Sequence, residues 1–247
     1  MVDILYGRNP VLEALRAGRT ARKIVVAAAV RPEPRLAEIL EQAHARDITV
    51  EEVPRQRLDD IAHTEHHQGV AGYFHARPAR TLDDVLREAR QPALLVVLDG
   101  IQDPQNVGAI ARSAEACGAD AVVVSRHHAA PLTGAAAKAS AGATEHLPLV
   151  TVPNLAHALD VIADAGLWRV GLAADADTRY DRADLRGPTA IVVGAEGSGM
   201  RRLTREHCDV LVSIPMLGHV ASLNAGAAAA VLLFEAQRQR GFVPRGA

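Results

Sequence analysis

Short, continuously apolar runs alternate along the chain with segments whose apolar residues recur at helical spacing. Residues 93–98, 121–124 and 190–193 are continuously apolar, which is typical of strands buried on both faces of a parallel sheet. Residues 155–165 and 222–240 carry apolar side chains every three or four positions, which predicts helices. We also expect helices at residues 106–117 and 201–207 and strands at residues 168–173 and 210–214. Strands that alternate with helices indicate an α/β fold with a mostly parallel sheet.

The first third of the chain has shorter elements. Asn9 is a favourable N-cap, Pro10 fits the first turn of a helix and Gly18 fits the position after its end, so we expect a helix between them. Further helices are expected at residues 36–45 and 57–61, and strands at residues 23–27, 48–50 and 70–74. This pattern predicts a small α/β domain.

The domain boundary is expected where Pro78, Pro92 and several charges surround one short amphipathic helix. We therefore predict the small α/β domain over residues 1–76, a linker over residues 77–92 and a larger α/β domain over residues 93–247. A chain of 247 residues with 49% apolar and 23% charged residues is long enough to bury two cores.

Composition excludes several classes of protein. No apolar run has the length of a membrane-spanning helix, and the first residues lack a basic stretch followed by an apolar one, so we expect a cytoplasmic protein with no membrane partner. Cys117 and Cys208 are too few for a disulfide framework or a metal cluster, and we expect two small buried hydrophobes and no metal. His66–His67 and His127–His128 are expected to be surface pairs, and Trp168 a core residue.

Charge is unevenly distributed. The net charge is −2, but residues 1–35 contain seven basic and three acidic residues. A segment with a net charge of +4 could hold phosphates, and it is equally compatible with an ordinary solvated surface. The basic residues are Arg8, Arg16, Arg19, Arg22, Lys23, Arg31 and Arg35.

Three segments at the ends of expected strands carry candidate chemistry. In the first, Asn106 and Arg112 lie on the helix after a buried strand, where they can line the same side. In an α/β protein in general, a helix-capping Asn106 and a surface cation at Arg112 would be the more ordinary explanation. In the second, Glu196 lies among three closely spaced glycines. Its spacing, G-x-x-G-x-G, differs from that of a dinucleotide loop, and a carboxylate would repel a pyrophosphate, which disfavours a dinucleotide-dependent oxidoreductase.

In the third segment, a strand leads through a loop to an alanine-rich helix, with Ser222 and Asn224 at its expected N-terminus. Free N–H groups there would favour a polar ligand, whereas ordinary helix capping by either side chain is the alternative.

At these residues the chain resembles the TrmH branch of the SPOUT methyltransferases. The specific stretches are residues 99–104, 194–208 and 213–224, and residues 6–11 and 67–70 resemble the family's substrate domain. The resemblance implies a trefoil-knotted α/β domain, S-adenosyl-L-methionine as cofactor, a homodimer formed through the C-terminal domain, and 2′-O-methylation of RNA. Within the family the chain is most similar to enzymes that methylate a guanosine in large-subunit (23S) ribosomal RNA.

The resemblance also implies roles for individual residues. Asn106, Arg112, Glu196, Ser222 and Asn224 match the family's catalytic positions. The positions that would hold the cofactor are Gly194, Ile214, Met216, Gly218 and Leu223. The chain departs from the family at Ala225-Gly226, where relatives usually have Val-Ser, so we expect altered packing there.

The role of Arg112 has two interpretations. The family's arginine is often assigned as the general base, but arginine is effectively always protonated. We favour a clamp that binds the adjacent phosphate and stabilises negative charge developing on the 2′-oxygen. Alternative functions are 2′-O-methylation of transfer RNA or of another ribosomal RNA site, including self-protection against an antibiotic, and RNA binding without catalysis.

Overall fold

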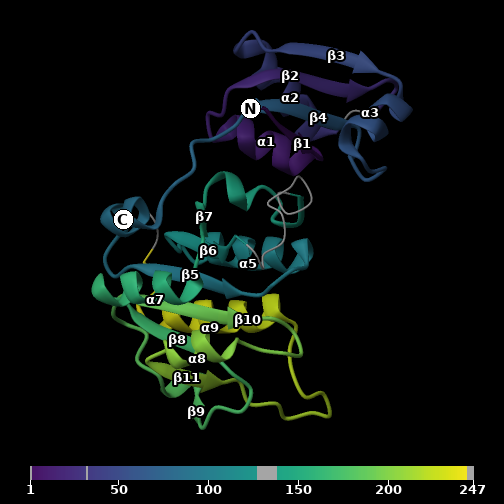
Figure 1. Ribbon diagram of the computed structural model, residues 1–247. Helices are drawn as coiled ribbons and strands as arrows, with labels where there is room; N and C mark the ends of the chain where they lie inside the picture. The colour runs from purple at the N-terminus through teal and green to yellow at the C-terminus, as the bar shows by residue number, and fades with distance from the viewer. Residues whose placement is uncertain (1, 32, 127–137, 244–247) are drawn as a thin grey trace. The chain divides into compact units, whose positions relative to one another are not determined.

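The computed structural model describes residues 2–31, 33–126 and 138–243 (Figure 1). The chain divides into two compact units. The first comprises residues 1–78 together with residues 132–146, and the second comprises residues 79–131 and 147–247. The α/β class expected from the sequence is confirmed in both.

The first unit is built on a four-stranded sheet in the order β1-β4-β2-β3. Strands β1 and β2 run antiparallel to β4, and β3 runs parallel to β2. Helices α1 and α2 pack on one face and α3 on the other. The elements are β1 (Val2–Tyr6), α1 (Arg8–Arg16), β2 (Ala21–Ala27), α2 (Pro34–Ala45), β3 (Thr49–Val53), α3 (Arg55–Ala62) and β4 (Val70–His75).

The start of α1 differs from the prediction. The helix begins at Arg8 with Gly7 as its N-cap, so Asn9 lies inside the first turn and does not cap it. Gln68 replaces the expected cap, because its side-chain oxygen accepts the Arg8 N–H at 3.0 Å. Gly7 has φ 94°, a conformation that glycine adopts readily.

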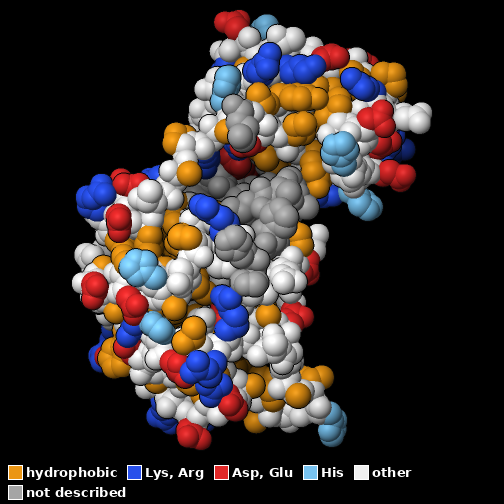
Figure 2. All heavy atoms as spheres, in the orientation of Figure 1, with side chains coloured by type: hydrophobic (Ala, Val, Ile, Leu, Met, Phe, Trp, Pro, Cys, Tyr) orange, Lys and Arg blue, Asp and Glu red, His pale blue; other side chains and the backbone are white. Residues whose placement is uncertain are grey.

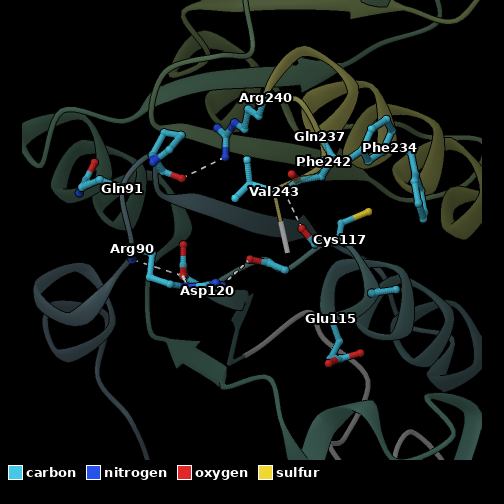
Figure 3. Close-up of a pocket in the computed structure, with 13 residues that line it drawn as sticks. Arg90, Gln91, Glu115, Cys117, Asp120, Phe234, Gln237, Arg240, Phe242 and Val243 are labelled. Atoms are coloured by element: carbon cyan, nitrogen blue, oxygen red, sulfur yellow. Dashed lines mark hydrogen bonds and ion pairs between the residues drawn. The ribbon is translucent and has the colours of Figure 1, made fainter. Parts of the chain in front are cut away.

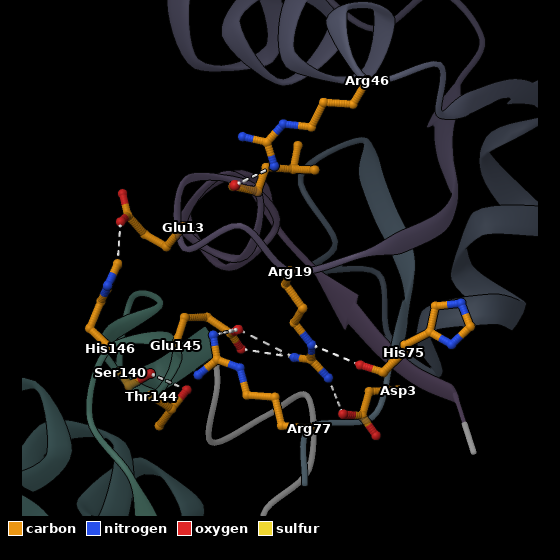
Figure 4. A network of polar contacts seen from close by, with 11 residues as sticks. Asp3, Glu13, Arg19, Arg46, His75, Arg77, Ser140, Thr144, Glu145 and His146 are labelled. Carbon is orange, nitrogen blue, oxygen red and sulfur yellow. Dashed lines mark hydrogen bonds and ion pairs between the residues drawn. The ribbon is translucent and has the colours of Figure 1, made fainter. Parts of the chain in front are cut away.

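A charged network attaches the segment from Lys138 to His146 to the first unit (Figure 4). The Glu145 side chain, only 5% exposed, accepts from Arg19 at 3.1 Å and from Arg77 at 2.9 Å. Next to it, His146 lies 2.9 Å from Glu13. A buried carboxylate needs such partners, since an unpaired charge in the interior is costly. The segment contains one turn of 3-10 helix, η1 (Ala143–Glu145).

The second unit contains a seven-stranded parallel sheet in the order β7-β6-β5-β10-β8-β11-β9. Helices α5 and α9 cover one face, and α4, α7 and α8 lie on the other. The strands are β5 (Leu94–Asp99), β6 (Ala121–Ser125), β7 (Leu149–Val152), β8 (Trp168–Leu172), β9 (Thr178–Arg179), β10 (Thr189–Gly194) and β11 (Val210–Ser213). The helices are α4 (Leu82–Glu88), α5 (Pro104–Ala116), α7 (Leu155–Asp164), η2 (Tyr180–Arg182), α8 (Arg202–Glu206) and α9 (Ala225–Gln239).

Helix α4 is the short helix expected within residues 77–92. Thr81 and Asp84 form a capping box at its start, and Leu82 and Val85 pack in the apolar cluster beneath α7. The helix therefore contributes to the core of the second unit.

Two expectations about single residues are wrong. Trp168 is 51% exposed at the first position of β8 and not a core residue. His67 is fully buried and not on the surface: its Nε2 lies 2.8 Å from Asp59, and its Nδ1 accepts the Gly69 N–H at 2.9 Å. His127 and His128 lie outside the described residues.

The described residues lack two features. None of their helices is long and apolar enough to cross a membrane. Residues 2–31, 33–126 and 138–243 contain no group of three or more potential metal ligands.

Candidate active site

The strand ends place the three candidate segments at one edge of the second unit's sheet. Strand β10 pairs with β5 in parallel register, with Gly194 opposite Asp99. The loops that follow these two strands therefore leave the sheet at the same edge. Loops at the carboxyl edge of a parallel sheet are the usual place for a ligand site in α/β folds.

Asn106, Glu196 and Asn224 form a closed group of hydrogen bonds. Glu196 Oε1 accepts from Asn106 Nδ2 at 3.1 Å, from Asn224 Nδ2 at 2.6 Å and from the Ala225 N–H at 3.1 Å. Asn224 Nδ2 also donates to Asn106 Oδ1 at 2.8 Å. Side chains 90 and 118 residues apart in the chain thus bind one another, and we refer to these three residues as the polar triad.

Helix ends fix two members of the polar triad. Asn224 is the N-cap of α9, and its Oδ1 accepts the N–H groups of Gly226 and Ala227 at 2.9 and 3.3 Å. Ser222, predicted to lie at this helix start, is an exposed loop residue before it. Asp103 caps α5 by accepting the Gln105 N–H, which leaves the Asn106 side chain free to bind the other two members of the triad.

Gly194 permits the glycine loop to fold back over the end of β10. Ala195 and Gly199 exchange hydrogen bonds of 3.1 and 2.8 Å across the loop. A Cβ atom on Gly194 would overlap backbone atoms of Gly199 and Met200. Glycine is therefore required here by the close approach of two backbone segments.

Asp99 and Arg201 hold the far end of this loop, a pair to which the sequence assigned no role. Asp99 is 1% exposed and accepts from the backbone N–H and the Nε of Arg201 at 2.7 and 2.6 Å. The sequence signal that could have revealed this pair is a carboxylate at the end of an otherwise apolar strand, because a buried charge needs a nearby partner.

The loop between β11 and α9 leaves its polar groups free. Within the described structure, residues 216–223 form no hydrogen bond or ion pair. The same loop exposes Leu217, Val220 and Leu223, which are 98%, 67% and 37% exposed. Free backbone donors and acceptors beside apolar side chains suit a ligand with both a flat apolar part and polar groups.

The remaining candidates do not join the polar triad. Arg112 is exposed on α5 and forms no hydrogen bond or ion pair with any described residue. Ile214 and Met216 are partly buried at the start of the β11–α9 loop, and Gly218 has open space around its Cα. A Cβ atom on Gly226 would lie 3.1 Å from the Cβ atom of Ala109, so glycine at this position allows α5 and α9 to pack closely.

A cavity of about 660 Å³ lies at the opposite edge of the sheet (Figure 3). Its two arginines are already paired: Arg240 donates to the carbonyls of Pro92, Leu185 and Gly187, and Arg90 donates to the carbonyl of Gly118. Burial lowers the pKa of Arg240. Since these cations are paired, the polar triad and the β11–α9 loop are the better candidate for the active site.

Comparison with known proteins identifies the class. Residues 93–234 match the SpoU rRNA Methylase family, and residues 4–79 match a family described as RNA 2′-O ribose methyltransferase substrate binding. The chain belongs to the SpoU rRNA methylase family. It is therefore an S-adenosyl-L-methionine-dependent RNA 2′-O-methyltransferase.

Individual relatives match over nearly the whole chain. The chain is 43% identical over 242 residues to the 23S rRNA (guanosine-2′-O-)-methyltransferase RlmB of Ralstonia nicotianae, covering 98% of this chain and 97% of the relative. It is 48% identical over 245 residues to an uncharacterized tRNA/rRNA methyltransferase of Mycolicibacterium vanbaalenii, covering 96% and 77%. The crystal structure of the SpoU methyltransferase AviRb from Streptomyces viridochromogenes with AdoMet superposes with a TM-score of 0.81 at 28% identity, covering 98% and 92%.

Proposed function

We propose that the protein transfers a methyl group to the 2′-hydroxyl of a guanosine in 23S ribosomal RNA and acts in the cytoplasm. The observation that carries the proposal is the match to RlmB of Ralstonia nicotianae through both units, including the substrate-binding part at residues 4–79. The polar triad and the unpaired β11–α9 loop supply the site that the activity needs. Transfer RNA is the competing substrate, since relatives at up to 48% identity are named tRNA/rRNA methyltransferases.

The residues around the polar triad fit S-adenosyl-L-methionine, which supplies an activated methyl group when bound. We propose that Gly194, Ile214, Met216, Gly218 and Leu223 hold it, because unpaired backbone groups and exposed apolar side chains meet in this loop. Glu196 has a second oxygen that makes no hydrogen bond to a described residue and could accept from a ligand. The polar triad then holds three loops in place around the cofactor.

We propose that Arg112 binds a phosphate of the RNA and stabilises negative charge on the 2′-oxygen, while Asn106, Glu196, Ser222 and Asn224 orient the reactants. Arg112 is exposed and has no partner among the described residues, which suits a group that binds substrate. The 2′-hydroxyl must lose a proton, and an arginine clamp that stays charged lowers the cost of that loss.

The first unit offers an aromatic surface for RNA. Tyr6 and Tyr73 lie partly exposed on the α3 face of the sheet. Lys23 Nζ lies 5.1 Å from the Tyr73 ring centre, and Lys138 Nζ lies 6.0 Å from that of Tyr6. Aromatic rings beside cations can stack on bases and attract the RNA backbone.

The basic residues near the N-terminus offer less unpaired positive charge for RNA binding than their number indicates. Four of the seven are in ion pairs, Arg8 with Glu33, Arg16 with Glu38, Arg19 with Glu145 and Lys23 with Glu51. Exposed Arg22, Arg31 and Arg35 have no ion-pair partner among the described residues. On the face shown in Figure 2, Lys and Arg side chains are interspersed with Asp and Glu.

We propose that the protein is a homodimer formed through the outer faces of α5 and α9, and that its second unit contains the family's trefoil knot. Phe234 on α9 is 48% exposed, and Phe242, which follows that helix, is 56% exposed. Ala109 and Ala116 on α5 are exposed and small, so another helix can approach closely. Exposed large apolar side chains of this kind mark interaction surfaces.

Ribosomal RNA from a strain lacking the gene tests the proposed substrate. Mapping of 2′-O-methyl groups should show one missing guanosine methylation in 23S ribosomal RNA, restored by the wild-type gene. An intact 23S pattern together with a missing methyl group in transfer RNA would replace the proposal with the competing one.

A further inference from the structure

A second cavity, of about 490 Å³, lies at the carboxyl edge of the second unit's sheet beside the ends of β6 and β7. Ser125, the start of α7 and the residues that follow the glycine loop line it. It adjoins the candidate active site through Arg201, which lines the cavity and is bound to Asp99 at the end of β5. None of the described residues that line it is acidic.

Ser125 leaves a buried hydroxyl without a partner. The residue is 4% exposed, and its Oγ has no hydrogen-bond partner within the described part of the chain. Ala121 and Val123, which share its side of β6, pack in the cluster beneath α7, so the Ser125 side chain faces α7. Buried hydroxyls are nearly always paired, so an unpaired one that lines a cavity is available to bind a ligand there.

The first turn of α7 adds backbone donors. The Asn154 side chain accepts only the His157 N–H, at 3.3 Å, and the N–H groups of Leu155 and Ala156 precede the first hydrogen bonds of the helix. Both residues line the cavity. Free N–H groups at the positive end of a ten-residue helix favour an anion.

Two further groups suit an anion with several oxygens. Thr204, 2% exposed, contributes a second buried hydroxyl side chain to the lining. Arg202 also lines the cavity; its side chain is 77% exposed and pairs only with Glu206, at 2.5 Å. Hydroxyls, helix N–H groups and a guanidinium form the donor set that proteins use for phosphate.

We propose that this cavity binds a backbone phosphate of the RNA strand and thereby positions the RNA at the active site. The inference rests on the proposed RNA substrate and assigns Ser125, Thr204 and Arg202 as positioning residues. Free inorganic phosphate has the same chemistry as a backbone phosphate, so the experiment has one arm for RNA and one for inorganic phosphate.

The test compares Arg202→Gln and Ser125→Ala with the wild-type enzyme, using a fluorescent fragment of 23S ribosomal RNA over a series of salt concentrations. Arg202→Gln should weaken RNA binding several-fold and reduce the salt dependence of binding by about one counterion. Ser125→Ala should weaken binding without changing the salt dependence, and should leave the melting temperature unchanged or higher. Both should raise KM for RNA with kcat at saturating RNA unchanged. Arg186→Gln is the matched control, because Arg186 is 72% exposed and paired with Asp184 away from the cavity.

The second arm follows inorganic phosphate binding to the RNA-free enzyme by calorimetry. Loss of phosphate binding in both variants with unchanged RNA affinity would overturn the RNA assignment, since the cavity would then take free phosphate. Variants equal to wild type in both arms would overturn the phosphate site altogether. A failure of the proposed function gives a different result, because the wild-type enzyme itself would then not methylate this RNA.

Discussion

The side-chain amide of Asn224 donates to the Glu196 carboxylate at 2.6 Å while its oxygen caps α9. A single side chain therefore joins the glycine loop to the first turn of the last helix. Because Asn106 binds both partners, removal of one member of the polar triad affects three loops.

Replacement of Glu196 tests this arrangement. Glu196→Ala removes the oxygen that three donors share, and a hydrogen bond to a charged group contributes about 1.5–3 kcal/mol. We expect affinity for S-adenosyl-L-methionine to fall by about tenfold or more, measured by calorimetry. Glu196→Gln keeps an acceptor oxygen, so its affinity for S-adenosyl-L-methionine should fall less. Equal affinity of Glu196→Ala and wild type would show that the triad does not shape the cofactor site.

Gly194→Ala should displace the glycine loop, because the added Cβ would overlap the backbone of Gly199 and Met200. We expect loss of cofactor binding and a lower melting temperature. Gly187→Ala is the control, since nothing lies within 4 Å of a Cβ at Gly187 and its φ is not positive. Normal cofactor affinity in Gly194→Ala would contradict the close approach described above.

Mixed subunits test where Arg112 acts. Asn106 and Arg112 are six residues apart on α5 and point in different directions, and Arg112 lies on the exposed side with Ala109 and Ala116. If the dimer forms through that side, Arg112 should serve the partner's site. Inactive Asn106→Ala and Arg112→Ala proteins should then regain part of the activity when unfolded together and refolded as mixed dimers. Mixed dimers without activity would place both residues in the same subunit's site.

Tyr73 tests the aromatic surface of the first unit. Tyr73→Leu removes the ring beside Lys23, and stacking of one base contributes about 1–3 kcal/mol. KM for RNA should rise about fivefold or more, with kcat and cofactor affinity unchanged. Tyr73→Phe keeps the ring and should behave as wild type. A rise in KM equal in both variants would assign the effect to the hydroxyl and contradict stacking.

The two cysteines should be unreactive in the folded protein. Burial raises the pKa of Cys117 to about 11 and that of Cys208 to about 12. Because the folded-state pKa values are raised, the stability due to the neutral thiols is present below the ordinary thiol pKa and is lost as the pH rises toward 11 and 12. At pH 8, alkylation should therefore be slow for native protein and fast in denaturant. Rapid labelling of the native enzyme would contradict this.

The sequence could predict that the candidate loops lie at one edge of the sheet but not the contacts between them. Apolar runs identified the strands that precede the candidate loops, and parallel strands necessarily end at one edge. The hydrogen bonds among Asn106, Glu196 and Asn224 depend on which strands are neighbours in the sheet. Strand β5 pairs not only with β6, the next strand in the sequence, but also with β10. Pairing order is a property of the whole sheet, so periodicity could not supply it.

Single-residue expectations failed where tertiary partners decide the environment. His67 is buried because Asp59 in α3 and the Gly69 N–H provide partners for both ring nitrogens. Trp168, at the first position of β8, is exposed, whereas Val170 on the same side of the strand is buried. Strand β1, which the sequence pattern did not predict, has no strict alternation of apolar and polar residues, and it pairs along its length with β4.

The attachment of Glu145 to Arg19 has a consequence for synthesis of the chain. Residues 1–78 leave the ribosome well before residues 138–146, yet the first unit contains both. Until Glu145 arrives, the Arg19 side chain, 6% exposed in the finished unit, lacks one of its two carboxylate partners. Completion of the first unit therefore waits for β5, α5 and β6 to be synthesised, and a chain truncated after residue 78 would lack a charge that its own interior requires.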